Sequence, residues 1–218
     1  GFVAVCMGKG ITNILKDLGV DRVIEGGQTM NPSTDDILKA VKRVKAKTVY
    51  VFPNNKNIIM AANQAAELVE DKKIVVIPSK SVPQCISAMV EFNDKKSAEA
   101  NEKAMNKAIG RVTSGQLTYA VRDTEIDGIE IKKDDILGMV EGKIVTVGKD
   151  IDDVLNRVVS QMVDEDTEFL NVYYGKEIKK PQADVMLRAL ETKYADDEIE
   201  VSFKKGGQPL YYYIISAE

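Results

Sequence analysis

The first 112 residues alternate between short apolar runs and amphipathic helical patterns, and this rhythm constrains the fold more than any other feature. Runs such as "FVAVC" and "KIVVIP" lack a regular alternation of polar and apolar residues, which is typical of strands buried on both faces. Helical patterns such as "STDDILKAVKRV" and "NIIMAANQAAELVE" separate these runs. Four strand–helix units in series predict an α/β fold with a doubly wound parallel sheet.

The pattern changes after Ser114 and Gly115. Strand-like segments with tight turns follow, including "QLTYAVRD" and "EIEVSFKKGGQPLYYYIISAE", and two helical segments interrupt them. We therefore expect two domains: a doubly wound α/β domain over residues 1–112, and a mixed α/β (α+β) domain over residues 113–218. A polar linker helix over 95–112 should close the first domain. Its apolar stripe is thin, so it either packs lightly or bridges the two halves.

Composition excludes several classes of function. The chain contains no histidine, which removes the commonest general base and every histidine metal site. Cys6 and Cys85 lie within apolar runs and lack metal-ligand spacing, so we expect buried thiols. No apolar run is long enough to cross a bilayer and no signal-peptide pattern is present, so we expect a cytoplasmic location. The chain starts at Gly1 directly in an apolar run, and we expect it to be part of a longer protein.

Charge is distributed unevenly along the chain. Residues 1–112 carry 17 basic and 12 acidic side chains, whereas residues 113–218 carry 13 and 22. Neither half combines a basic cluster with aromatic residues, so nucleic acid is not an expected partner. The asymmetry fits either a charged recognition surface or ordinary variation of a protein surface.

Polar loops follow all four predicted strands of the first domain. In a parallel sheet these loops meet at the carboxyl edge of the strands, where ligands of such folds bind. Gly26 and Gly27 permit positive φ and close backbone approach, and Ser33 or Thr34 should cap the next helix. Lysines in three of the loops would suit an anion or an acidic partner. The candidate binding residues at this edge are Lys9, Gly26, Gly27, Gln28, Thr29, Asn31, Ser33, Asn54, Asn55, Lys56, Asn57, Ser79, Lys80 and Ser81.

Two observations limit what these loops can be predicted to bind. Proline, asparagine and glycine are also the usual residues of turns between strands and helices, so a purely turn-forming role stays open. The segment "GKGITN" has Asn13 where a dinucleotide fingerprint has its third glycine, so no dinucleotide site is predicted.

The second domain contributes a polar corner and a tyrosine-rich tail. Arg122 and Asp123 are further candidate binding residues, and with Asp127 they flank a predicted hairpin turn. Paired carboxylates can hold a metal or perform acid–base chemistry, but an arginine-stapled loop is the favoured interpretation. In a terminal strand Tyr211 and Tyr213 should face one side and Tyr212 the other, which leaves at least one ring for a surface or an interface.

Several of these segments together resemble a known family. The segments "GGQTMNPSTDDIL", "PNNKNIIMAANQAAEL", "VVIPSKSVPQ", "GQLTYAVRDTEIDGIEIKKDDILG" and "GQPLYYYIISAE" occur in the order found in the C-terminal part of the ATP-binding subunit of bacterial fatty acid kinase. This is a dihydroxyacetone kinase-like family associated with DegV proteins. The resemblance covers essentially the whole chain.

The resemblance implies a partner and a division of labour. In that family a DegV-like fatty-acid-binding protein presents its fatty acid, which is phosphorylated to acyl phosphate for phospholipid synthesis. ATP and Mg belong to a kinase domain that has no counterpart in these residues, so no cofactor and no catalytic residue are expected here. We expect a non-catalytic region that docks the DegV-like partner. The alternatives are a small-molecule or phosphate-binding enzyme domain related to the substrate-binding domain of dihydroxyacetone kinase, and a structural homodimer.

Overall fold

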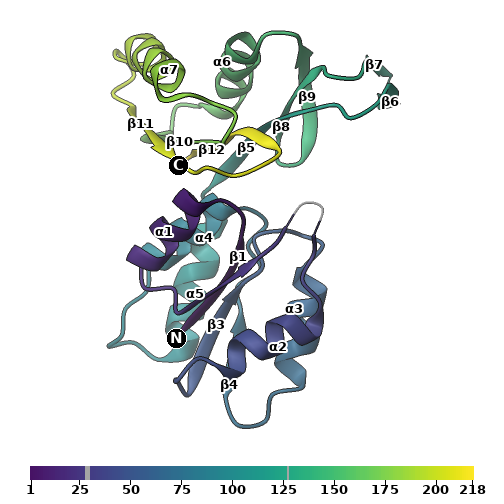
Figure 1. Ribbon diagram of the computed structural model, residues 1–218. Helices are drawn as coiled ribbons and strands as arrows, with labels where there is room; N and C mark the ends of the chain where they lie inside the picture. Colours follow the sequence, from purple (N-terminus) through teal and green to yellow (C-terminus); the bar gives the residue numbers. More distant parts are fainter. Residues whose placement is uncertain (28–29, 127) are drawn as a thin grey trace. The chain divides into compact units, whose positions relative to one another are not determined.

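The computed structural model describes residues 1–27, 30–126 and 128–218, and Figure 1 shows the path of the chain. Its residues form two compact units, Gly1–Val112 and Thr113–Glu218. The predicted α/β class is confirmed, with a parallel sheet in the first unit and a mixed sheet in the second. Within the described residues no helix combines the length and the apolar character needed to cross a membrane. The cytoplasmic location stays a prediction.

The first unit alternates strands and helices as its sequence rhythm predicts. Its elements are β1 (Phe2–Cys6), α1 (Lys9–Asp17), β2 (Arg22–Glu25), α2 (Thr34–Lys42), β3 (Thr48–Phe52), α3 (Ile59–Glu67), β4 (Lys73–Val76), α4 (Val82–Val90) and α5 (Ala98–Ile109). The strands pair in parallel in the order β2-β1-β3-β4. Helices α2 and α3 lie over one face of this sheet, and α1, α4 and α5 lie over the other (Figure 1).

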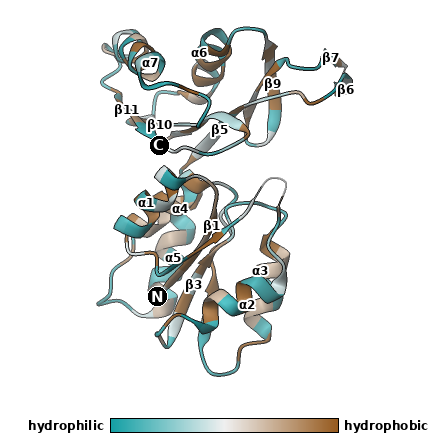
Figure 2. Ribbon diagram, viewed as in Figure 1, coloured by the Kyte–Doolittle hydropathy of each residue, from teal (hydrophilic) through white to brown (hydrophobic). Residues whose placement is uncertain are grey.

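Strands β1 and β3 are buried on both faces, which explains their continuous apolar sequences. Val3 and Val5 join Val49 and Val51 in a core that α2 and α3 cover. On the opposite face the aromatic ring of Phe2 stacks on Tyr50 at 5.6 Å between centroids. The same two strands form the brown, apolar centre of this unit in Figure 2. A strand in this position has no face on which polar residues could alternate.

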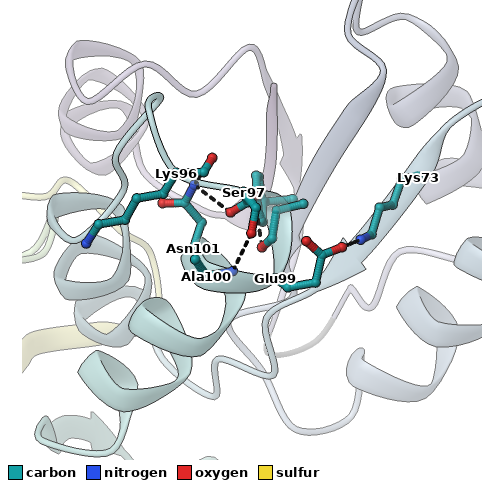
Figure 3. Close-up of polar contacts among 8 residues, drawn as sticks. Lys73, Lys96, Ser97, Glu99, Ala100 and Asn101 are labelled. Atoms are coloured by element: carbon teal, nitrogen blue, oxygen red, sulfur yellow. Dashed lines mark hydrogen bonds and ion pairs between the residues drawn. The ribbon is translucent and has the colours of Figure 1, made fainter.

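Helix α5 belongs to the first unit rather than bridging the two. The predicted helix over 95–112 is shorter in the structure, and it packs against α4. Its first turn is held by Asn101, which is 1% exposed. The Asn101 side-chain amide donates to the carbonyls of Lys96 and Ser97, both labelled in Figure 3. It also donates to the carbonyl of Asn93, and its oxygen accepts from the Asn93 N–H at 2.8 Å. One buried amide therefore satisfies four backbone groups of the loop that enters the helix.

A charged contact joins the same turn to the sheet. Ser97 caps α5 by accepting from the Ala100 N–H at 3.2 Å, and the Glu99 carboxylate pairs with Lys73 of β4 (Figure 3). The Lys73 ammonium holds the pKa of the Glu99 carboxyl well below its usual range. Both side chains are largely exposed, so the pair orients the helix more than it stabilises the fold.

The second unit is a mixed sheet with helices packed on it. Its elements are β5 (Thr113–Tyr119), β6 (Thr124–Ile126), β7 (Ile129–Ile131), β8 (Ile136–Val140), β9 (Lys143–Gly148), α6 (Ile151–Met162), β10 (Phe169–Tyr174), α7 (Lys180–Lys193), β11 (Glu200–Lys205) and β12 (Tyr211–Ala217). The strand order is β11-β10-β12-β5-β8-β9, and only β10 and β11 pair in parallel among the described strands of this sheet. Strands β6 and β7 form a separate hairpin (Figure 1).

Glycines let α6 lie close against this sheet. A Cβ atom at Gly115 would collide with Met162, and one at Gly138 would collide with Val158. Met162 and Val158 are buried members of the core of this unit. The two glycines therefore set the distance between helix and sheet.

The tyrosine tail differs from its prediction at one residue. The pairing of β12 with β5 shifts between Tyr211 and Tyr213, so strict alternation of side chains fails there. Tyr213 is fully buried in the core of the second unit, and Tyr212 packs partly buried against the same core. The prediction that Tyr212 faces away from Tyr213 is therefore wrong. It assumed that side chains alternate strictly along the strand, and the sequence gives no sign of the register shift that interrupts this alternation.

We predict that Asn101→Ala lowers the free energy of unfolding by about 2–3 kcal/mol, because it removes all the hydrogen bonds that this buried side-chain amide makes to the loop before α5. Asn106→Ala, on the same helix, is the matched control and should cost under about 0.5 kcal/mol. Urea denaturation of both variants measures the difference. Equal stabilities would contradict the role assigned to Asn101.

Candidate functional site

The carboxyl ends of β1, β2, β3 and β4 meet along one side of the first unit, which we call the strand-end edge. The loops at this edge are residues 7–8, 26–33, 53–58 and 77–81, and α1, α2, α3 and α4 begin there. All the candidate residues predicted in the first domain lie in these loops or at the first helical residue after them. The structure describes each of them except Gln28 and Thr29, which lie outside the described residues.

Asn54 and Ser79 are bonded to each other across the edge. The Asn54 N–H donates to Ser79 Oγ at 3.2 Å, and the Ser79 hydroxyl donates to Asn54 Oδ1 at 2.7 Å. Asn54 Nδ2 donates to the carbonyl of Val5 at 2.9 Å. Asn54 itself has φ 56°, a left-handed conformation that asparagine tolerates better than most residues. These bonds join the ends of β1, β3 and β4, so both side chains hold the loops in place.

Two serines of the edge are helix caps. Ser33 Oγ accepts from the Asp36 N–H at 3.2 Å, and Asp36 Oδ2 accepts from the Ser33 N–H at 2.9 Å, which completes a capping box. Ser81 Oγ accepts from the Gln84 N–H at 3.3 Å at the start of α4. The bonds from Ser33 lower the pKa of the Asp36 carboxyl. The cap predicted at Ser33 is thus formed.

Gly26 and Gly27 fit the turn that joins β2 to α2. A Cβ atom at Gly26 would lie 2.7 Å from the Met30 carbonyl oxygen, and Gly27 has φ 104°. Asn55 Oδ1 accepts from the Asn57 N–H at 2.9 Å in the next loop. Each of these residues therefore has a structural task in its turn.

Other side chains at the edge are exposed to solvent. The polar ones are Lys9, Asn31, Lys56, Asn57 and Lys80. Two methionines that the sequence did not single out accompany them: Met30 is 65% exposed and Met60 is 70% exposed. Flexible, polarisable methionines adapt to varied partner surfaces. In the sequence, the signal for these two residues was their place in the loop after β2 and in the first turn of α3.

The cysteines lack the features of a nucleophile or a metal ligand. Both are free and buried, and burial raises the pKa of the Cys6 and Cys85 thiols. Within the part of the chain that the structure describes, no group of three or more Cys, Asp or Glu side chains is placed to hold a metal ion.

Arg122 and Asp123 belong to the second unit, and the loops of the strand-end edge belong to the first. The Lys133 N–H donates to Asp123 Oδ1 at 2.7 Å, so a backbone bond to this carboxylate holds the corner before β6. Asp127 lies outside the described residues. The expected arginine staple stays a prediction.

The chain has the α/β fold that is also seen in DegV and in dihydroxyacetone kinase. It matches DegV of Bacillus subtilis, a fatty acid binding protein, with a TM-score of 0.67 and 13% identity over 100% of this chain and 98% of that one. It matches the dihydroxyacetone kinase of C. freundii with a TM-score of 0.63 and 13% identity over 100% of this chain and 47% of that one. The TM-scores show a shared fold, and at identities this low the matches show nothing further.

The sequence itself defines the family. The model of the FakA-like C-terminal family, in which FakA denotes one subunit of fatty acid kinase, matches residues 1–218. The chain is 50% identical to Protein YloV of Bacillus subtilis (strain 168) over 218 residues, which are 100% of this chain and 39% of that protein. It is 45% identical to a protein of Staphylococcus aureus (strain USA300) over 99% of this chain and 39% of that protein. The chain belongs to the FakA-like C-terminal family of fatty acid kinase, as its resemblance predicted, and spans about two fifths of these relatives.

We predict that Asn54→Ala destabilises the first unit by about 2–3 kcal/mol, through lost hydrogen bonds and the left-handed backbone. Asn54→Gly removes the same bonds but tolerates φ 56°, so it should recover about 1 kcal/mol of that loss. Thermal and urea unfolding measure both. Asn57→Ala, on an exposed side chain of the same loop, is the control, and equal losses in all three would contradict the assignment.

The capping box makes a pH-dependent contribution to stability. Because the folded-state pKa of Asp36 is lowered from 3.8, its contribution is present above that value and disappears as the pH falls through the folded-state pKa. We therefore expect Asp36→Asn to be less stable than the native chain at pH 7, with the difference narrowing below about pH 4. Urea unfolding at several pH values measures it, with the exposed Asp94→Asn as control. A pH-independent difference would contradict the prediction.

Proposed function

We propose that this chain is a docking region for a DegV-like fatty-acid-binding protein. The observation that carries the proposal is the match of residues 1–218 to the FakA-like C-terminal family of fatty acid kinase. The chain spans 39% of YloV, and we assign ATP and Mg binding and phosphoryl transfer to the remainder of such proteins. Its own role is to bring the fatty acid carried by the partner to that remainder.

The strand-end edge supports this proposal as the contact surface. Lys9, Lys56 and Lys80 give three of its loops an exposed positive charge, which would steer an acidic partner surface. Met30, in the loop after β2, and Met60, in the first turn of α3, add exposed apolar area at the same edge. A combination of adaptable apolar side chains and a charged rim is typical of protein–protein interfaces.

A second candidate function is the binding of a small phosphorylated molecule at the same edge. The shared fold with dihydroxyacetone kinase and the three exposed lysines favour it. The geometry weakens the case for phosphate binding, because the side chains of Asn54 and Ser79 already form hydrogen bonds with each other and with the carbonyl of Val5. An anion would have to displace bonds that hold the ends of the strands together.

Titration calorimetry of the 218-residue chain with the fatty-acid-loaded DegV-like protein of the same organism tests the docking proposal. We expect saturable binding, and we expect Lys56→Ala combined with Lys80→Ala to weaken it about tenfold by removing two rim charges. Asn54 is left unchanged because its substitution would disturb the loops themselves.

The matched control is Lys103→Ala combined with Lys107→Ala, two exposed lysines of α5 that change the net charge equally. Absence of binding by the native chain would overturn the docking proposal. Binding that the two lysine pairs affect equally would move the contact away from the strand-end edge. Calorimetric titration of the chain with inorganic phosphate tests the second candidate function, the binding of a phosphorylated molecule. Light scattering of the chain alone tests the predicted homodimer.

A further inference from the structure

Strand β2 ends the sheet of the first unit, and among the described residues no strand pairs with its outer side. The Gly26 N–H donates to the Cys6 carbonyl of β1 at 3.2 Å, in the register that pairs Cys6 with Glu25. In a parallel pair, alternate residues direct their N–H and C=O groups to the same side. The peptide groups of Arg22 and Ile24 therefore also point toward β1, and those of Val23 and Glu25 point toward the open edge.

Hollows lie on either face of this open strand. One, of about 490 Å³, lies between β2 and the region of α2 and is lined by Met30, Pro32, Lys39 and Arg43. The other, of about 430 Å³, lies beside α1 and is lined by Lys9, Thr12 and Lys16. Arg22, Val23 and Glu25 line both. Because successive side chains of a strand point to opposite faces, an added strand would direct its side chains alternately into the two hollows.

The walls of these hollows carry an excess of uncompensated positive charge. Lys9, Lys16, Arg22 and Arg43 are exposed and form no ion pair within the described residues. Glu25 is the corresponding unpaired carboxylate.

The other charged residues in the walls already have partners. The Asp21 carboxylate accepts from the Phe2 N–H at 2.7 Å, and Asp36 is bonded in the capping box. Lys39 pairs with Asp35 at 2.6 Å. The carboxylates keep their negative charge in these bonds, so the walls hold five cationic side chains against three acidic ones, an excess of positive charge beside the unpaired backbone.

We propose that the open edge of β2 binds an extended, acidic segment of a partner protein, which pairs with β2 as an added strand. The outward peptide groups of Val23 and Glu25 supply main-chain hydrogen bonds, and the cations on both faces select acidic side chains. The binding surface is distinct from the exposed lysine pair of Lys56 and Lys80, and the proposal does not depend on the docking function proposed above.

The test uses a capped peptide that alternates valine with glutamate, and a matched peptide with lysine in place of glutamate. Both are titrated into the ¹⁵N-labelled 218-residue chain. With the acidic peptide, the amides of Val23 and Glu25 should shift and become protected from hydrogen exchange. The Ile24 amide, which points toward β1, should gain little protection. The lysine peptide should not produce this pattern.

Charge reversal separates recognition from a non-specific effect. Arg22→Glu combined with Arg43→Glu should weaken the acidic peptide by roughly fivefold and strengthen the lysine peptide. Lys103→Glu combined with Lys107→Glu makes the same change in net charge on α5 and should leave both peptides unaffected. Circular dichroism confirms that each variant is folded.

Three outcomes would overturn the proposal: no protection at Val23 and Glu25 at saturating acidic peptide, equal binding of the two peptides, or equal weakening by both pairs of substitutions. The first would mean that the short, charged β2 serves only to prevent pairing between copies of the chain. The other two would mean that the charge of the whole chain, and not the walls of the hollows, governs peptide binding.

Discussion

The burial of β1 and β3 on both faces is the constraint on which the first unit depends. A parallel strand can be followed by another only through a crossover, and apolar side chains on both faces require a helix layer above and below. The same crossovers bring every carboxyl strand end, and the start of every following helix, to one side. The strand-end edge is therefore a consequence of how the core is buried, whatever its loops contain.

Features that rest on local periodicity could be predicted from the sequence. The alternation of "FVAVC", "TVYVF" and the helical segments predicted the parallel sheet, and Ser33 followed by Asp36 carried the signal of a helix cap. Features that rest on tertiary contacts could not. Asn101 reads as one polar residue among many in a polar helix, and only the folded loop shows that its amide is buried. The bulge in β12 depends on pairing with β5, which the strand's own sequence does not record.

The candidate site shows the same division. The four loops were predicted to meet because strand direction alone requires it, but the task of each side chain was not predictable. Asn54 and Ser79 lie 25 residues apart in the sequence and were both predicted as binding residues. In the structure they are hydrogen-bonded to each other and hold two loops together. Proteins that share this fold at 13% identity show how little the fold determines a site. Assignment of function therefore rests on family membership and on the side chains left exposed.

The positions of the two thiols have a practical consequence. Cys6 and Cys85 are both buried, and both lie in the first unit. A thiol reagent can reach either sulfur only when that unit opens, whereas opening of Thr113–Glu218 exposes no thiol at all. The rate at which a thiol reagent labels the native chain therefore reports the opening of the first unit alone, and no cysteine has to be introduced for the measurement.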